Sequence, residues 1–240
     1  MKKILHLVAL VAISLCFVQC ETEKIGENGA YKGHEYVDLG LSVKWATCNV
    51  GATTPEEYGD YFAWGETETK EVYNYETYKY CEGTETTLTK YCHDKKYGAN
   101  GFVDNKYELE LKDDAAHVNW GGKWRMPTAD ELDDLRYSCT WEWTVQNGVA
   151  GLLGTSRIEG YTDRTIFFPA AGLIYGDYGC SGTEFLGHYW CKSVREDLEP
   201  IYSTMVFQFF FDEEKKEISQ LEFNYIFPRF VGGTVRAVVE

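Results

Sequence analysis

The chain has 240 residues, enough for one sizeable domain, and a formal net charge of −15, which makes nucleic acid and anionic membrane surfaces poor partners. Aromatic residues make up 16% of the chain, a content typical of an all-β or α+β core with an aromatic face. Mean hydropathy is −0.37 and the only long apolar run lies at the N-terminus, so we predict no internal membrane span.

Residues 1–20 are interpreted as an export signal. They begin with two lysines, continue with the apolar run Ile4 to Val18 and end at Cys20. A cysteine directly after such a run resembles a bacterial lipoprotein signal, so we predict that Cys20 is lipidated. The glutamates that follow resemble the surface-export signal of Bacteroidetes lipoproteins, which implies an outer-membrane or cell-surface location with the lipid as the membrane contact. A plain secretory peptide and an N-terminal anchor remain alternatives.

Residues 21–33 are polar and contain glycine, so we expect a short tether. Residues 34–240 then form a single predicted domain. They contain no internal repeat and no low-complexity segment that would divide them.

The first strands are expected over residues 34–41 and 43–50, with Trp45 facing inward. Beyond them the pattern becomes irregular from residue 51 to residue 112, with a short buried strand expected over residues 60–64. A connection of this length is usually a functional loop or an excursion that packs on itself.

The stretch Asp113–Leu135 has the strongest local pattern in the chain. It predicts a short helix, a Gly-Gly break and a second helix that begins after Thr128. Glu131 completes a capping box, in which each side chain accepts a hydrogen bond from the other residue's free backbone N–H. Leu132 and Leu135 have helical spacing, so one face of the second helix is expected to turn inward.

Arg125 lies between Trp124 and Met126, just before this second helix. A buried guanidinium at this position would need a carboxylate and backbone carbonyls as partners. We therefore assign structural roles to five residues of this stretch: Trp120, Trp124, Arg125, Thr128 and Glu131.

The C-terminal half is predicted to be rich in strands. A short strand over residues 166–170 is stopped by Pro169, and residues 175–182 are rich in glycine and form turns. Residues 202–211 alternate in side-chain type, as a strand with two distinct faces does. Successive antiparallel strands are expected over residues 189–193, 202–211 and 217–225, and residues 234–239 are expected to close the chain as a final strand.

Six cysteines follow the export signal, an even number that suggests disulfides in an exported protein. The sequence allows 15 pairings. The simplest local pairs are Cys81–Cys92 and Cys180–Cys191, because each pair is separated by 11 residues. That choice leaves Cys48–Cys139, although Cys139 could equally be a buried free thiol. None of these cysteines has CxxC spacing, which disfavours a thiolate metal site.

An acidic cluster precedes the first predicted helix. Its carboxylates offer the oxygen ligands that a structural calcium ion prefers. The cluster lacks the glycine and the spacing of an EF-hand loop, so we favour a solvated face with a helix cap and predict no metal and no cofactor. Its members are Asp104, Glu108, Glu110, Asp113 and Asp114.

Tyrosine is unusually frequent in the irregular region. Tyrosine supplies rigid amphipathic area at small entropic cost, as ligand-binding surfaces require. We nevertheless expect most of these rings to pack the loop onto the body of the protein. The candidate ligand-binding residues are Tyr73, Tyr75, Tyr78, Tyr80, Tyr91, Tyr175, Tyr178 and Tyr189.

Several phrases together resemble the Fibrobacter succinogenes major paralogous domain, a family of exported Bacteroidetes lipoproteins. They include EYVDLGL (35–41), WATCNVGA (45–52), YGDYFAWGET (58–67), DDAAHVNWGGKWRMPT (113–128) and VRAV (235–238). The resemblance covers nearly all of residues 34–240. It implies an α+β, C-type-lectin-like fold with mostly antiparallel strands, two short helices and long irregular loops. Cys191 and Ala237 depart from the family's usual Ser and Pro.

The same resemblance implies a distant relation to the formylglycine-generating enzymes, which hold copper with two late cysteines. Here Cys180 and Cys191 are the only late cysteines, and we favour a disulfide for them. No calcium-binding lectin triplet and no GxSxG motif is present. Our leading hypothesis is a cell-surface lipoprotein that binds a glycan or protein ligand without catalysis. The alternatives are a structural component of the envelope or of surface appendages, and an oxidase-like enzyme.

Overall fold

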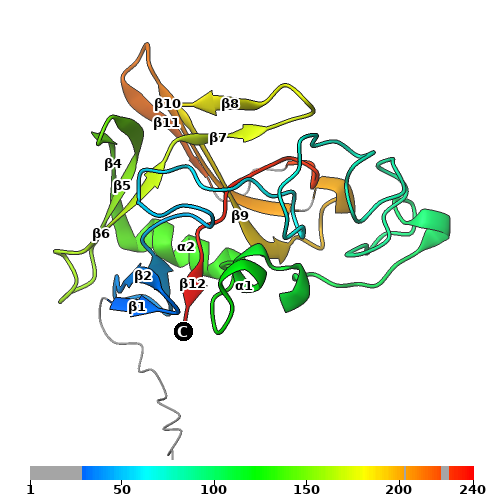
Figure 1. Cartoon of the computed structure of the whole chain (residues 1–240), viewed down its shortest axis with the longest axis horizontal. Helices are drawn as coiled ribbons and strands as arrows, with labels where there is room; N and C mark the ends of the chain where they lie inside the picture. Colours follow the sequence, from blue (N-terminus) through cyan, green and yellow to red (C-terminus); the bar gives the residue numbers. More distant parts are fainter. Residues whose placement is uncertain (1–28, 203, 223–226) are drawn as a thin grey trace, which may run out of the picture.

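The computed structural model of the chain describes residues 29–202, 204–222 and 227–240 (Figure 1). Within them, mostly antiparallel strands form several sheets accompanied by two α-helices, which confirms the α+β class. The export signal, the predicted lipidation at Cys20 and most of the tether lie outside the described residues. In the described part of the chain, no helix is both long enough and apolar enough to cross a membrane.

One antiparallel sheet joins the two ends of the described chain, in the order β1-β2-β3-β12. Lys32 and Gly33 both have positive φ, 54° and 84°, and form the tight turn that pairs Tyr31 with His34. The predicted tether is therefore corrected, since its last residues already belong to this sheet. The strands are β1 (Gly29–Tyr31), β2 (His34–Val37), β3 (Lys44–Ala46) and β12 (Val238–Val239).

A second sheet has the order β4-β5-β6, and its first hairpin, β4–β5, was not predicted. Asn147 and Gly148 connect the two strands with φ of 49° and 85°, the conformation for which an Asn-Gly turn is favoured. The sheet consists of β4 (Cys139–Gln146), β5 (Val149–Ser156) and β6 (Thr165–Pro169). The third strand confirms the short strand expected near Pro169.

The remaining strands form a hairpin and a three-stranded sheet. The hairpin consists of β7 (Ala171–Ile174) and β8 (Cys180–Thr183). The sheet has the order β11-β10-β9, with β9 (Leu186–Val194), β10 (Thr204–Asp212) and β11 (Glu217–Glu222). The two pairings of the sheet are antiparallel, as expected. The β7–β8 hairpin is also antiparallel but was not predicted, and β8 begins within the residues expected to form turns.

The two helices are α1 (Ala115–Trp120) and α2 (Ala129–Ser138). The predicted capping box of α2 is confirmed: the Glu131 N–H donates to Thr128 Oγ1 at 3.2 Å, and the Thr128 N–H donates to Glu131 Oε2 at 2.8 Å. Leu132 and Leu135 are buried, as their spacing predicted. The short 3₁₀ turns are η1 (Ala99–Gly101), η2 (Leu111–Asp113) and η3 (Pro200–Tyr202).

The core consists of two apolar clusters. One contains Trp64, Tyr91 and Trp124 and lies beneath the irregular region. The other includes Trp45 and Phe168 together with the inward rings of the sheets. Trp45 is fully buried, as predicted.

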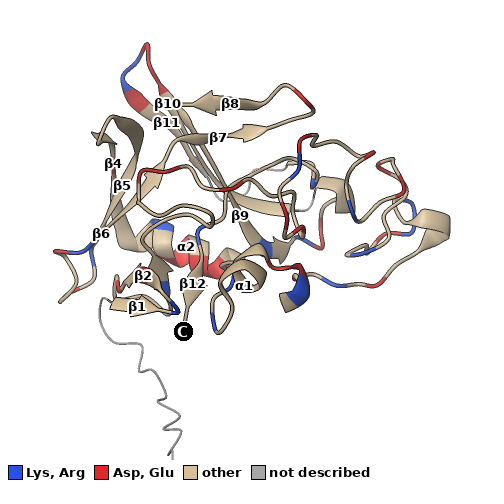
Figure 2. Cartoon of the chain, in the orientation of Figure 1, with Lys and Arg blue, Asp and Glu red and all other residues tan. Residues whose placement is uncertain are grey.

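The irregular region from residue 51 to residue 112 packs beside the sheets, much of it as the cyan to green loops of Figure 1. Backbone hydrogen bonds tie it to the body: the Phe62 N–H donates to the Gly233 carbonyl at 2.9 Å, and the Leu109 N–H donates to the Lys192 carbonyl at 3.0 Å. Figure 2 shows charged residues on the connecting loops, on α2 and at the tip of the β10–β11 hairpin, whereas strands β7 and β8 carry none.

Candidate functional site

Most of the candidate tyrosines are buried. Five of the eight have exposed fractions of only 0–6%, and Tyr75 is partly buried. The prediction of an exposed binding surface is therefore wrong for these five, because their rings face the protein interior. The buried residues are Tyr73, Tyr78, Tyr80, Tyr91 and Tyr189. Packing onto the body, the role favoured for most rings of the irregular region, is the role observed.

Asp113 organises the buried tyrosines of the irregular region. The carboxylate is almost fully buried. The Tyr80 hydroxyl donates to Oδ1 at 2.5 Å, the Tyr91 hydroxyl donates to Oδ2 at 2.7 Å, and the Lys90 ammonium pairs with the same carboxylate. Burial alone would raise the pKa of Asp113, but hydrogen bonds from Lys90, Tyr80 and Tyr91 outweigh burial and lower it. The Asp113 carboxylate therefore holds the irregular region in place.

The rest of the acidic cluster is also bonded to protein donors. Asp114 caps α1 by accepting from the His117 N–H at 3.0 Å. Glu108 forms an ion pair with Lys192 at 2.9 Å, and Asp104 accepts from two backbone N–H groups at 2.9 Å. Within residues 29–202, 204–222 and 227–240, no group of three or more His, Cys, Asp or Glu side chains is arranged to hold a metal ion.

The six cysteines that the structure describes are all free thiols. The predicted pairs Cys81–Cys92, Cys180–Cys191 and Cys48–Cys139 are therefore not formed. Equal sequence spacing does not bring two Cα atoms within the 4.4–6.8 Å that a disulfide requires. In the last predicted pairing Cys139 is instead a buried free thiol, the alternative considered for it.

The environments of the late cysteines disfavour thiolate chemistry. Cys191 is fully buried, and burial raises the pKa of its thiol to about 12. Cys180 is exposed on β8, yet partial burial of its thiol also raises its pKa. A nucleophilic cysteine needs a lowered pKa, and neither thiol has one in the absence of a metal ion.

Two candidate tyrosines are exposed, and both belong to the turn of the β7–β8 hairpin. Tyr175 is 50% exposed and Tyr178 is 88% exposed; we call these two residues the hairpin patch. The Tyr175 ring packs edge-on against Phe230, with centroids 5.1 Å apart. Reciprocal backbone hydrogen bonds of 2.8 Å join Gly176 to Tyr73. The turn is therefore held firmly while its aromatic rings stay accessible.

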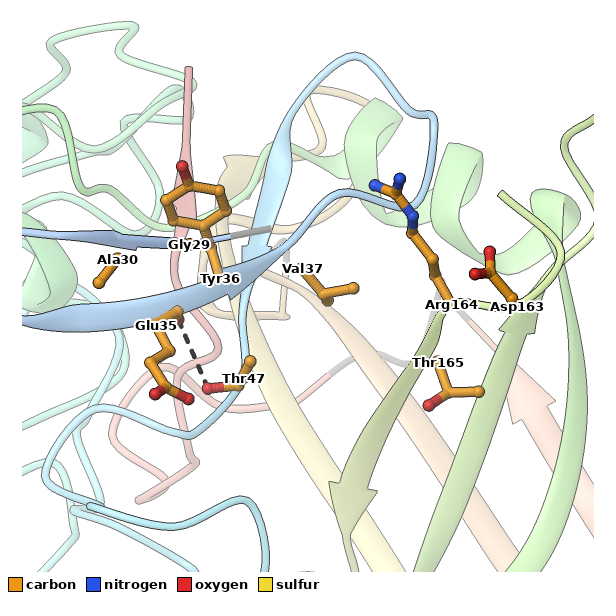
Figure 3. A pocket seen from close by; sticks show the side chains of 9 residues that line it. All are labelled: Gly29, Ala30, Glu35, Tyr36, Val37, Thr47, Asp163, Arg164 and Thr165. Carbon is orange, nitrogen blue, oxygen red and sulfur yellow. Dashed lines mark hydrogen bonds between the residues drawn. The ribbon is translucent and has the colours of Figure 1, made fainter. Parts of the chain in front are cut away.

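A second exposed feature was not predicted from the sequence: an open groove of about 700 Å³ between β1–β2 and the edge of β6 (Figure 3). Its walls include Gly29, Glu35, Asp163 and Thr165. A smaller cavity of about 130 Å³ shares Thr165 with it and continues along Phe167. We call the two together the β6-edge groove. Pro169 was the available signal, because proline in a strand favours an edge position.

Hydrogen bonds from the second sheet hold one wall of the β6-edge groove. The Ser156 hydroxyl donates to the Leu39 carbonyl at 2.8 Å, and the Arg164 guanidinium donates to the Asp38 carbonyl at 3.1 Å. These bonds attach the segment after β2 to the β5–β6 sheet. The groove is therefore a fixed feature of the fold, with walls from distant parts of the sequence.

The hairpin patch and the β6-edge groove are both accessible surfaces of the described part of the chain. None of the five predicted structural residues lines the groove or belongs to the hairpin patch; Trp124 is buried in the core and Arg125 pairs with Glu131. Comparison of the chain with protein-family models, with curated proteins and with solved structures finds no match.

Proposed function

We propose that this protein is a lipid-anchored cell-surface protein that binds a glycan through the hairpin patch, without catalysis. The observation that carries the proposal is the exposure of Tyr175 and Tyr178 on a turn held by Phe230 and Tyr73. The negative face of an aromatic ring attracts the polarised C–H groups of a sugar ring. Asp177, between the two tyrosines, is exposed and supplies an acceptor for sugar hydroxyls.

The proposed scaffold is a C-type-lectin-like fold. Its support is the pairing of the N-terminal strands with β12, the long irregular region over residues 51–112 and the two short helices that come after it. The export signal and Cys20 support the surface location. A fixed scaffold lets an exposed turn bind with little loss of conformational entropy.

The test is a glycan array probed with the purified protein, followed by titration of the best glycan. We expect Tyr178→Ala to weaken binding roughly 10-fold or more, which corresponds to about 1.4 kcal/mol. The matched control is Tyr137→Ala, since Tyr137 lies on α2 and is 64% exposed. If the protein binds no glycan on the array, the proposal is wrong. Co-purification with envelope proteins and no glycan binding would favour the structural alternative.

A further inference from the structure

Four lysines and two carboxylates in and directly after the irregular region form one connected set of ion pairs, which we call the lysine network. Its members are Lys79, Lys90, Lys106, Lys112, Glu110 and Asp113. Four positive and two negative charges leave an excess of two positive charges, whereas the whole chain has a formal net charge of −15. Figure 2 shows both signs of charge on these loops. The lysine network is therefore a locally cationic site on an acidic protein.

Glu110 brings three of the ammonium groups together. Its carboxylate lies 2.6 Å from Lys90 Nζ and 3.3 Å from Lys112 Nζ, and it also pairs with Lys106. Hydrogen bonds from Lys106, Lys90 and Lys112 lower the pKa of Glu110 to about 2. The network contains no histidine, the side chain that ordinarily titrates between about pH 5 and 8, so its charge is constant over this range.

Contacts with buried residues fix the position of the network. Asp113 is almost fully buried. The Tyr91 hydroxyl accepts from the Glu110 N–H at 3.0 Å and donates to Asp113 at 2.7 Å. The Lys79 ammonium lies over the Tyr80 ring, 5.0 Å from its centroid. An anion would therefore meet ammonium groups that are already in place, which lowers the entropic cost of binding.

The ammonium groups of Lys106 and Lys112 are accessible and have unused donors. Their side chains are 42% and 73% exposed. An ammonium group has three N–H donors, and among the described residues each of these two has Glu110 as its one ion-pair partner. The Lys79 ammonium, 3.8 Å from Asp113, makes no hydrogen bond within the same residues. Several N–H donors therefore remain for an added anion.

Charge and size together favour a compact dianion as the ligand. A phosphate monoester carries a charge of about −1.5 to −2 at pH 7 and three strong acceptor oxygens, which match the excess charge and the unused donors. Lysine binds phosphate as a point charge. A long polyanion would extend beyond the screening length of about 8–10 Å and meet the negative charge of the rest of the protein. A sulfate monoester carries only one negative charge.

We infer that the lysine network binds the phosphate group of a small phosphate monoester. Lys106 and Lys112 donate directly to the phosphate oxygens, and Lys79 and Lys90 add positive potential. Glu110 orients the ammonium groups but also competes with the phosphate for them. The inference does not depend on the proposed glycan site, because the network lies outside the β7–β8 turn.

The opposite effects of two substitutions test the inference. Lys112→Gln removes an exposed cation and should weaken binding about 5-fold or more, whereas Glu110→Gln removes the competing anion and should strengthen binding about 3-fold or more. The matched control is Lys123→Gln, since Lys123 is exposed and lies outside the network. Calorimetric titration of the full chain with glucose 6-phosphate, at low salt and in mild detergent, measures the three variants and the wild-type protein.

Further probes identify the group that is recognised. Inorganic phosphate contains no sugar, so its binding cannot come from the hairpin patch: binding equal to that of glucose 6-phosphate shows recognition of the phosphate alone, and weaker binding shows that the sugar is contacted as well. Glucose 6-sulfate should bind more weakly than glucose 6-phosphate at pH 7.5. Binding of glucose 6-phosphate should weaken from pH 7.5 to pH 5, because the phosphate gains a proton near pH 6.

Several outcomes would overturn the inference. One is that neither phosphate probe binds. Another is weaker binding by Glu110→Gln, which would show that the network only needs to be intact. Equal binding of the phosphate and sulfate esters would exclude selection of a dianion, and tighter binding of an oligonucleotide would assign the network to a long polyanion. Tyr178→Ala should leave the binding of inorganic phosphate unchanged, so this test and the glycan test fail separately.

Discussion

The tyrosines of the irregular region and those of the β7–β8 turn look alike in the sequence, yet their environments are opposite. Tyr78 is buried, and its hydroxyl donates to the Trp64 carbonyl at 2.9 Å. Tyr178 is 88% exposed. Both lie in polar connections between expected elements. Residue type and local polarity therefore do not distinguish a packing tyrosine from a binding one.

The difference in burial follows from the length of each connection, which decides whether it can fold back onto the sheets. The irregular region is long enough to return to the sheets at several points, and its rings fill the space beneath it. The β7–β8 turn has only a few residues between its two strands, so it cannot cover its own rings. Most of the buried tyrosine hydroxyls have a partner, as Tyr73 shows by donating to the Tyr61 carbonyl at 2.6 Å.

The largest expected effect comes from Asp113→Ala, which removes the acceptor shared by Tyr80, Tyr91 and Lys90. We expect the free energy of unfolding to fall by about 3 kcal/mol, because two buried hydroxyls lose their acceptor and Lys90 keeps only its ion pair with Glu110. Denaturant unfolding measures the change. The control is Glu108→Ala, whose ion pair with Lys192 lies nearer the surface and should matter little. Equal stability of the two variants would contradict the packing role.

The Asp113 carboxylate should also make the free energy of unfolding depend on pH in the acidic range. Its pKa is lowered below the ordinary value of 3.8, so the unfolded chain takes up its proton first as the pH falls. The stabilisation is therefore fully present above pH 3.8 and is lost as the pH falls through the lowered pKa. Asp113→Ala should show a smaller loss of stability in this acidic range than the wild-type protein.

Arg125→Ala tests the ion pairs of Arg125, which lie outside both tyrosine regions. The Arg125 guanidinium donates to Glu131 at 2.6 and 2.8 Å and to Glu240 at 2.9 Å. We expect a loss of about 2 kcal/mol, since the pair is only partly buried. Thermal melting is the measurement, with the exposed Lys123→Ala as control. Near-wild-type melting would show that the stability of the fold does not depend on these ion pairs.

The smallest expected effect comes from removing one tyrosine hydroxyl, and it compares a buried tyrosine with an exposed one directly. Tyr78→Phe removes a buried hydroxyl and leaves the Trp64 carbonyl without its donor, so stability should fall by about 1 kcal/mol. Tyr178→Phe removes an exposed hydroxyl and should leave the free energy of unfolding unchanged. Paired unfolding curves measure both. A reversed order would contradict the environments described for the two rings.

The sequence determined the elements that depend on neighbouring residues. The capping box of Thr128 and Glu131 involves residues three apart, so its pattern was sufficient to predict the start of α2. The Asn147-Gly148 turn was equally local, and its signal was present although the hairpin was not predicted. The partners of Arg125 were predicted by type, a carboxylate and a backbone carbonyl, because a buried charge requires them.

Only the tertiary structure decided which surfaces remain accessible. The burial of Tyr78 and the free state of Cys139 depend on contacts with distant residues, for which sequence spacing carries no information. The β6-edge groove lies between Glu35 and Thr165, which are far apart in the chain. Local patterns specify hydrogen bonds within a few residues. A surface depends on which segments cover one another, and long-range packing alone sets that.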